Sequence, residues 1–191
     1  MKLHIYLFRH GQTTFNRDKR FTGWIDARLT KKGILDAKKI ALKLRNKKID
    51  LSYTSDFERC KKTLKEVLKY HKECKKVLID KRLRERDYGA FDGLYHEQII
   101  KKYGEDMFKK WHRGYNFPTP KGESMKMVEK RVTPFIKDLL KKMKKEKANV
   151  AISASGNSMR PIRKYFEKLS VQQMMKIESP WDDYFDYTIE V

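Results

Sequence analysis

Two short loops carry the residues best suited to chemistry. The first follows an apolar stretch near the start of the chain and begins with Arg9 and His10. A histidine at the end of a strand can act as a nucleophile, and a neighbouring guanidinium can hold the anion that it attacks. The second loop follows the apolar run Val150–Ser153 and contains Ser155 and Gly156. If a helix begins there, its backbone N–H groups can bind an anion.

Each loop also has a competing explanation. Taken alone, His10 beside Gly11 is better explained as a histidine that caps a loop. The strand, turn and helix around Ser155 have the outline of a nucleophile elbow, but the pattern G-x-S-x-G needs glycines where Ser153 and Asn157 stand. The sequence therefore disfavours Ser155 as a nucleophile.

The elements that position these loops follow from apolar periodicity and turn signals. The predicted strands are residues 2–8, 50–54, 77–79, 150–153 and 184–191. The predicted helices are residues 30–46, 95–103, 105–111, 123–145 and 157–168. Two more helices are expected, one capped by Ser55 and a short one with a capping box of Ser170 and Gln173. Strands that alternate with helices predict an α/β fold. We expect a three-layer sandwich with a mostly parallel central sheet flanked by helices.

The first long helix carries two local predictions. Thr30 is expected to be its N-cap residue. Its apolar face, which we expect to be buried, carries Ile34, Ala37, Ala41 and Leu44.

We expect one domain over residues 1–191. The irregular segment from about residue 83 to 122 is predicted to be an insertion that covers one end of the sheet and the active site. In such folds the active site lies at the carboxyl ends of the strands, which is where both candidate loops begin.

The chain is strongly basic, with 46 Lys and Arg against 25 Asp and Glu and a net charge of +21. This charge favours anionic partners. Because the lysines are spread along the predicted helices and no basic patch is interleaved with aromatic residues, we expect small phosphorylated metabolites, not nucleic acid or a membrane. No apolar run is long enough to span a bilayer and no signal peptide is recognisable, so the expected location is cytoplasmic. Cys60 and Cys74 lack the spacing of a zinc site or a disulfide framework.

Several ordered motifs resemble one protein family. The stretch from Arg9 to Asn16, R-H-G-x-T-x-x-N, resembles the signature of the histidine phosphatase superfamily. FTGW and LTKKG, which follow it, resemble the cofactor-dependent phosphoglycerate mutase branch. Further stretches that resemble the family are TSDFERCKKT (54–63), LRERDYGAFDG (83–93), KKWHRGYNFPTPKGES (109–124) and SGNSMR (155–160).

The resemblance implies a mechanism and a set of residue roles. His10 would become phosphohistidine, Arg9 and Arg59 would hold the phosphoryl oxygens, and Glu85 would exchange the proton of the substrate hydroxyl. The implied reaction interconverts 3-phosphoglycerate and 2-phosphoglycerate in glycolysis and gluconeogenesis, with 2,3-bisphosphoglycerate as the priming phosphate donor and no metal. The implied substrate-binding residues are Asn16, Thr22, Gly23, Arg86, Tyr88, His96, Arg113, Gly156 and Asn157.

The candidate site departs from the family pattern at one catalytic position. Ser155 stands where the family has a second catalytic histidine, and no histidine of this chain lies in that loop. We expect the serine hydroxyl to offer one neutral hydrogen bond, and the loss of a charged donor to cost about 10²–10³ in rate. The other catalytic positions of the motif set are intact, as they would be in an inactivated variant.

Two basic positions of the mutase pattern also differ. His96 occupies the region of a lysine or arginine, and His112 with Arg113 replaces an arginine pair. These differences leave two alternatives open: a histidine-type phosphatase acting on small phosphate monoesters, and a catalytically impaired protein that binds phosphorylated ligands. The sequence is compatible with a homo-oligomer and does not define its size.

Overall fold

The structure, a computed structural model that describes residues 1–191, is built around one sheet of five strands. The strands are β1 (Lys2–Arg9), β2 (Leu51–Thr54), β3 (Lys76–Ile79), β4 (Val150–Ala154) and β5 (Tyr184–Glu190). Their order is β3-β2-β4-β1-β5, and all neighbours are parallel except β5, which runs antiparallel to β1. This arrangement confirms the predicted α/β fold with a mostly parallel sheet.

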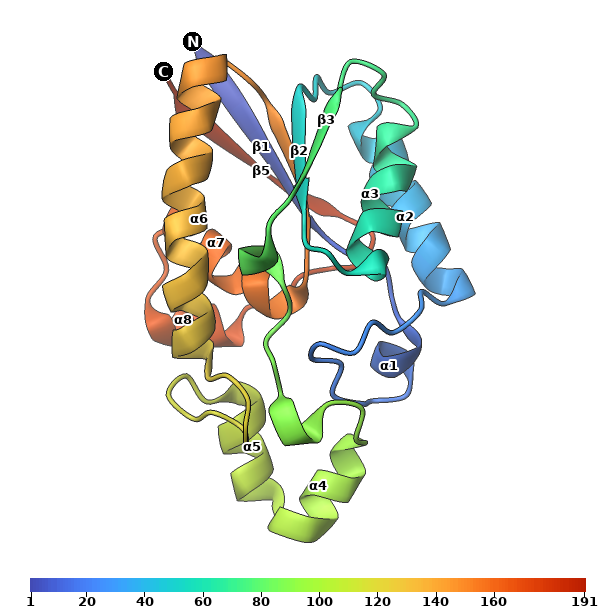
Figure 1. Cartoon of the computed structure of the whole chain (residues 1–191), viewed down its shortest axis with the longest axis vertical. Helices are drawn as coiled ribbons and strands as arrows, with labels where there is room; N and C mark the ends of the chain where they lie inside the picture. The colour runs from blue at the N-terminus through green and yellow to red at the C-terminus, as the bar shows by residue number, and fades with distance from the viewer.

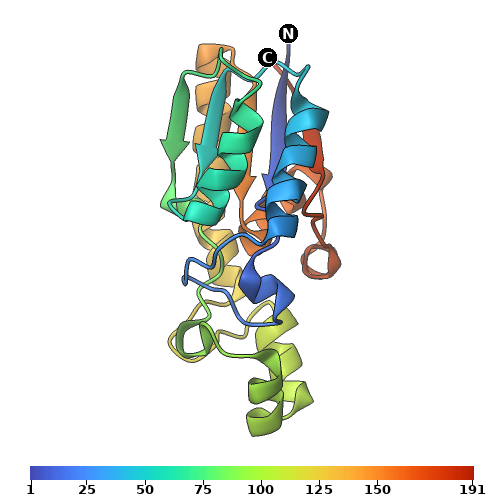
Figure 2. The ribbon, with the colours of Figure 1, turned by 90° about the vertical axis from the view of Figure 1, so that its right-hand side faces the viewer.

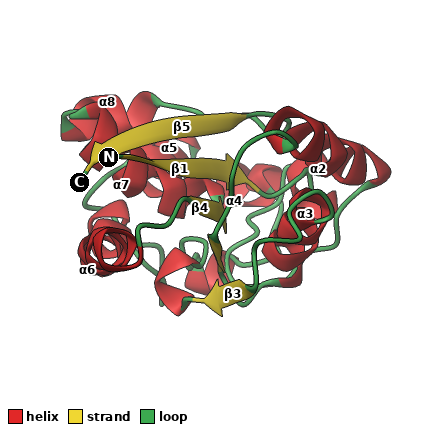
Figure 3. Ribbon diagram, turned by 90° about the horizontal axis from the view of Figure 1, so that it is seen from above, coloured by secondary structure: helices red, strands yellow, loops and turns green.

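Helices cover both faces of the sheet. They are α1 (Thr14–Arg17), α2 (Lys31–Leu44), α3 (Glu58–Leu68), α4 (His96–Tyr103), α5 (Glu105–Arg113), α6 (Met125–Glu146), α7 (Gly156–Glu167) and α8 (Val171–Lys176), with short 3₁₀ turns η1 (Lys81–Leu83) and η2 (Gly89–Phe91). Figures 1 and 3 show α6 and α7 on one face and α2 and α3 on the other. None of these helices is both long enough and apolar enough to cross a membrane.

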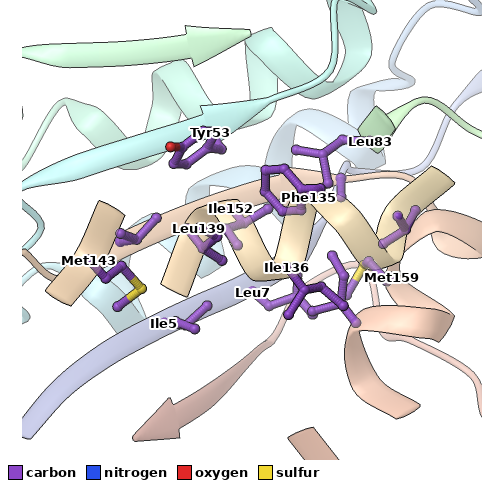
Figure 4. Packing of buried hydrophobic residues seen from close by; sticks show 14 of the residues in the cluster. Ile5, Leu7, Tyr53, Leu83, Phe135, Ile136, Leu139, Met143, Ile152 and Met159 are labelled. Atoms are coloured by element: carbon purple, nitrogen blue, oxygen red, sulfur yellow. The ribbon is translucent and has the colours of Figure 1, made fainter. Parts of the chain in front are cut away.

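Alternate residues of β1 contribute to two separate hydrophobic clusters. Leu3, Ile5 and Leu7 pack against α6 and α7, in the cluster that Figure 4 shows from close by. Tyr6 and Phe8 pack against α2 and α3. Because β1 is buried on both faces, its end is held firmly where the first candidate loop begins.

Side-chain caps confirm two of the predicted helix starts. Thr30 Oγ1 accepts from Gly33 N at 2.9 Å at the start of α2. At the start of α8, Ser170 Oγ accepts from Gln173 N at 3.2 Å, and Gln173 Oε1 accepts from Ser170 N at 2.8 Å. Both caps satisfy backbone donors that have no partner within the helix.

Two other local predictions are wrong. Ser55 is not the cap of α3: the N-cap position is Phe57, and the chain makes a further turn in which Phe57 N donates to Ser55 Oγ at 3.4 Å. Ile34 is 43% exposed. It lies in the first turn of α2, beside a surface groove that also contains Lys62 and Lys65, and so does not reach the core.

Residues 83–122 lie beyond the carboxyl ends of the parallel strands, as Figures 1 and 2 show. They include α4 and α5, which pack against each other. A third hydrophobic cluster joins this segment to the loop after β1, because Phe21 packs there with Tyr88, Phe91 and Ile99. The two parts of the chain therefore enclose the space below the strand ends.

Candidate active site

His10 is the first residue after β1, and its backbone N–H donates to Ala154 O on β4 at 3.1 Å. Its side chain is buried, and Nδ1 lies 2.8 Å from Gly11 O. Because a carbonyl oxygen only accepts, Nδ1 carries the proton and Nε2 keeps its lone pair. Burial, and then the charges of Arg59 and Arg9, hold the pKa of His10 well below its usual range. A neutral imidazole with a free Nε2 is the form that a nucleophile needs.

The loop after His10 is packed against the first turn of α2. A Cβ on Gly11 would lie 2.0 Å from Gly33 O, and a Cβ on Gly33 would lie 2.0 Å from Gln12 O. Both positions therefore need glycine to let the two backbones touch. On the other side, Gly11 N donates to Thr63 Oγ1 of α3 at 3.1 Å.

Two guanidiniums lie near His10. Arg59 is fully buried and donates to two backbone carbonyls of the loop after β1, among them Gly23 O at 3.0 Å. Arg9 lies over the ring of Trp181, 5.0 Å from its centroid. The Nε atoms of both arginines are buried and have no partner in the protein. A buried donor without a partner is costly, so each arginine keeps one N–H that is able to bind an anion.

Glu85 connects the segment after η1 to the start of α7. It is nearly buried, and Oε1 accepts from Arg86 N at 2.7 Å and from Asn157 N at 3.2 Å. Asn157 Nδ2 donates in turn to Tyr88 Oη at 3.0 Å. These bonds hold the carboxylate at the pocket wall, where it can exchange a proton with a bound hydroxyl.

The predicted site residues fall into two groups. Nine line one pocket: Arg9, Asn16, Thr22, Glu85, Tyr88, His96, Arg113, Gly156 and Asn157. Five lie behind its wall: His10, Gly23, Arg59, Arg86 and Ser155. Two of these five bond to neighbouring residues: Gly23 O accepts from Arg59, and Arg86 Nε donates to Glu123 O at 2.7 Å while its Nη1 is buried without a partner.

Ser155 is the N-cap residue of α7 and is fully buried. Its Oγ lies 3.7 Å from Cys60 Sγ, and its N–H donates to Ser158 Oγ at 3.2 Å. The hydroxyl contacts Cys60 and lies behind the pocket wall, as His10 does, so the neutral hydrogen bond expected from it to a ligand stays a prediction. The anion-binding capacity of this loop rests instead on α7, whose first residues, Gly156 and Asn157, line the pocket.

His96 and His112 line the pocket from α4 and α5. Their ring centroids are 4.9 Å apart, and both rings pack with Phe21 and Phe108. Burial, and then the charge of Arg113, lowers the pKa of both histidines, and that of His112 falls to about 3. At neutral pH these two positions are therefore uncharged.

Residues 5–184 match the sequence profile of the histidine phosphatase superfamily (branch 1). The chain belongs to this superfamily. The matched range contains both candidate loops, and it confirms the resemblance on which the residue assignments rest.

Curated relatives of this histidine phosphatase superfamily member are named mutases, and the solved structures with a similar fold include phosphatases and a mutase. It is 36% identical to the 2,3-bisphosphoglycerate-dependent phosphoglycerate mutase of Parvibaculum lavamentivorans, over 91% of this chain and 84% of the relative. It is 35% identical to the mutase of the same name from Mesorhizobium japonicum, over 93% and 88%. Among solved structures, a mycobacterial glucosyl-3-phosphoglycerate phosphatase superposes with a TM-score of 0.84 at 23% identity, covering 98% of this chain and 91% of that one. The phosphoglycerate mutase of Bacillus anthracis superposes with a TM-score of 0.77 at 22% identity, covering 99% and 88%.

Ten residues that line the pocket of this superfamily member were not among the predicted site residues, although His112 had been noted beside Arg113. They are Phe15, Lys19, Arg20, Phe21, His112, Arg160, Ile177, Glu178, Ser179 and Trp181. Arg160 had a signal, because it ends the SGNSMR motif. The residues from 177 to 181 had none, since they lie in an unpatterned segment between α8 and β5.

Proposed function

We propose that this protein is a phosphoglycerate mutase that moves a phosphoryl group between the two hydroxyls of glycerate through phosphohistidine at His10. The observation that carries the proposal is the pairing of a neutral His10, whose Nε2 is free, with the unpartnered Nε atoms of Arg9 and Arg59. The relatives named phosphoglycerate mutase support the choice of substrate.

In the proposed cycle, the free hydroxyl of the bound phosphoglycerate attacks the primed phosphohistidine, so that a new ester bond forms as the bond from phosphorus to His10 Nε2 breaks. The Glu85 carboxylate takes the proton of that hydroxyl. In the return step, His10 Nε2 forms a bond to the other phosphorus of the resulting 2,3-bisphosphoglycerate, the bond from that phosphorus to its ester oxygen breaks, and Glu85, now the carboxylic acid, gives its proton to the departing oxygen. Arg9 and Arg59 neutralise the phosphoryl charge throughout, which is the main contribution a protein makes to such a reaction.

The priming donor is proposed to be 2,3-bisphosphoglycerate, which supplies a phosphoryl group for His10 when bound. The pocket suits a ligand with two anionic ends, because five cationic side chains line it: Arg9, Lys19, Arg20, Arg113 and Arg160. Arg9 would hold one phosphate beside His10, and Arg113 and Arg160 would hold the other end. We propose no metal, since guanidiniums supply the positive charge, and expect only small phosphorylated metabolites as partners.

The first experiment is a coupled assay of 3-phosphoglycerate conversion, with and without 2,3-bisphosphoglycerate. The comparison is between this protein, Ser155→His and Ser155→His with Cys60→Ala, which makes room for the ring; Cys60→Ala alone is the control. A restored donor should raise the rate about a hundredfold. His10→Gln should abolish both conversion and phosphohistidine labelling. If neither histidine variant converts 3-phosphoglycerate, the mutase assignment is wrong.

A phosphatase is the second candidate, and a specific observation favours it. His96 and His112 are uncharged where the mutase pattern has cations, which weakens the hold on the carboxylate of glycerate. Several solved structures of the same fold are also named phosphatases. Measuring released phosphate in the same assay separates the two, because a mutase returns the phosphoryl group to glycerate and a phosphatase passes it to water.

A further inference from the structure

A carboxylate of the chain itself occupies part of the pocket. Glu178 lies in the segment between α8 and β5 that forms one wall. Its Oε1 is 2.8 Å from Arg113 Nη2 and 3.4 Å from Arg160 Nη2. One carboxylate therefore already bridges Arg113 and Arg160, the two guanidiniums that would bind the second anionic end of a ligand.

The contacts around Glu178 let its side chain leave Arg113 while its own backbone and Arg160 stay in place. Its backbone is fixed, because Arg163 Nη1 donates to Glu178 O at 2.7 Å. Its side chain is 63% exposed and can turn into solvent. Arg160 stays in place when the carboxylate leaves, since its Nη1 donates to Met174 O and Met175 O, both at 2.8 Å.

We propose that Glu178 is a displaceable competitor for the second anionic group of the ligand. This inference rests on the proposed function, in which the phosphoryl group lies at Arg9 and His10. A ligand with an anionic second end must exchange its own anion for the Glu178 carboxylate on Arg113 and Arg160. A ligand with a neutral second end leaves Glu178 where it is. Glu178 therefore lowers the affinity for ligands with two anionic groups and favours their release.

The test compares two ligands that differ at this end. 3-Phosphoglycerate carries a carboxylate, and glycerol 3-phosphate carries a neutral hydroxymethyl group in the same place. Exposed ion pairs are weak, and the substitution also removes a negative charge from the pocket, so Glu178→Gln should tighten 3-phosphoglycerate binding by about three- to tenfold. Binding of glycerol 3-phosphate should stay within about twofold. Dissociation constants come from calorimetry, without 2,3-bisphosphoglycerate, and from tryptophan fluorescence, to which Trp181 in the pocket contributes.

Asp182→Asn is the matched control. It removes the same charge from the same segment, but Asp182 pairs with Lys39 and does not line the pocket. We expect it to change neither affinity. The inference is overturned if Glu178→Gln weakens 3-phosphoglycerate binding, which would make Glu178 a positioning residue for the arginines. It is also overturned if Glu178→Gln changes the affinity for both ligands equally. The same holds if Glu178→Gln and Asp182→Asn change the affinity for 3-phosphoglycerate equally.

The readout is binding, so it separates this inference from the mutase proposal. Tighter binding of 3-phosphoglycerate by Glu178→Gln, in a protein that never converts it, would uphold Glu178 as a competitor and reject the mutase. If neither the wild type nor the variant binds 3-phosphoglycerate, both proposals are wrong. Glu178→Ala, which removes the carboxylate without leaving an amide, should reproduce the result.

Discussion

His10, His96 and His112 are held in environments that favour their uncharged forms. For His10, the proposed nucleophile, this keeps the neutral ring available below neutral pH. The neutral rings of His96 and His112 leave their part of the pocket without positive charge. The same property links stability to pH, because the unfolded chain frees each ring to take up a proton at its ordinary pKa.

His112 gives the sharpest test of that linkage. Its pKa is about 3 in the folded protein, below the unfolded value of about 6.5. The stability that this group contributes is therefore present above about pH 6.5 and is lost as the pH falls toward the folded pKa. Between about pH 7.5 and 5.5, the free energy of unfolding should fall by about 1.4 kcal/mol less in His112→Phe than in the wild type. Urea unfolding at both pH values measures this.

The control for that experiment is His4→Gln. His4 lies on β1, outside the pocket, where it pairs with Asp186 and its side chain is one-third exposed. Equal pH dependence in the wild type and His112→Phe would contradict the prediction. Activity is not needed for either measurement.

The sequence could predict those site residues that belong to recognisable local motifs. His10 and Glu85 belong to local motifs whose letters can be read without a structure. Glu178 could not be found in this way, because its importance comes from two arginines that are far away in sequence. The orientation of Ser155 was equally hidden, since its contact with Cys60 depends on how α3 packs against β4, the strand that Ser155 follows.

At the level of elements, the start of α2 does more than cover the sheet. Gly33 stands in its first turn, where a helix would normally gain about 1 kcal/mol from alanine. Here the added methyl group would meet Gln12 O at 2.0 Å. We therefore expect Gly33→Ala to destabilise the protein by about 1–3 kcal/mol and to displace the loop that follows His10. Lys31→Ala, an exposed change in the same turn, is the control.

The measurements for Gly33→Ala are the urea midpoint and phosphohistidine labelling of His10. Both should fall in Gly33→Ala and stay near the wild-type values in Lys31→Ala. A Gly33→Ala protein that is more stable than the wild type would show that the loop moves without cost.

Among the elements, regular patterns were predictable and their ends were not. The strands and long helices follow from apolar periodicity that packing reinforces. The errors at Ser55 and Ile34 arose where a single residue had to define an end or a face. The four-residue helix α1 was not predicted, because its stability comes from Thr13 and Asn16, which bond to each other's backbone across one turn.

Across the whole molecule, the charge of +21 should assist ligand capture. Raising the salt concentration from about 50 to 500 mM should weaken 3-phosphoglycerate binding several-fold, because the screening length falls below the width of a pocket. Lys19→Gln, at the pocket, should weaken binding at low salt by about twofold and reduce the salt dependence. Titrations at both salt concentrations test this.

Lys144→Gln is the control for position. Lys144 lies in the last turn of α6, at the opposite end of the molecule from α4 and α5 in Figure 1. If Lys19→Gln and Lys144→Gln weaken 3-phosphoglycerate binding equally, the affinity depends on the net charge of the protein and not on where the charge lies.

The sheet topology also bears on the order in which the active site can form. β1 pairs only with β4 and β5, and Arg9 is in register with Ala154. During synthesis, β1 therefore leaves the ribosome long before either of its partners exists. Such long-range pairing is slow to form and leaves an apolar strand exposed in the meantime. His10, the proposed nucleophile, is therefore made before both neighbouring strands, and its setting is complete only when β4 and β5 have joined β1.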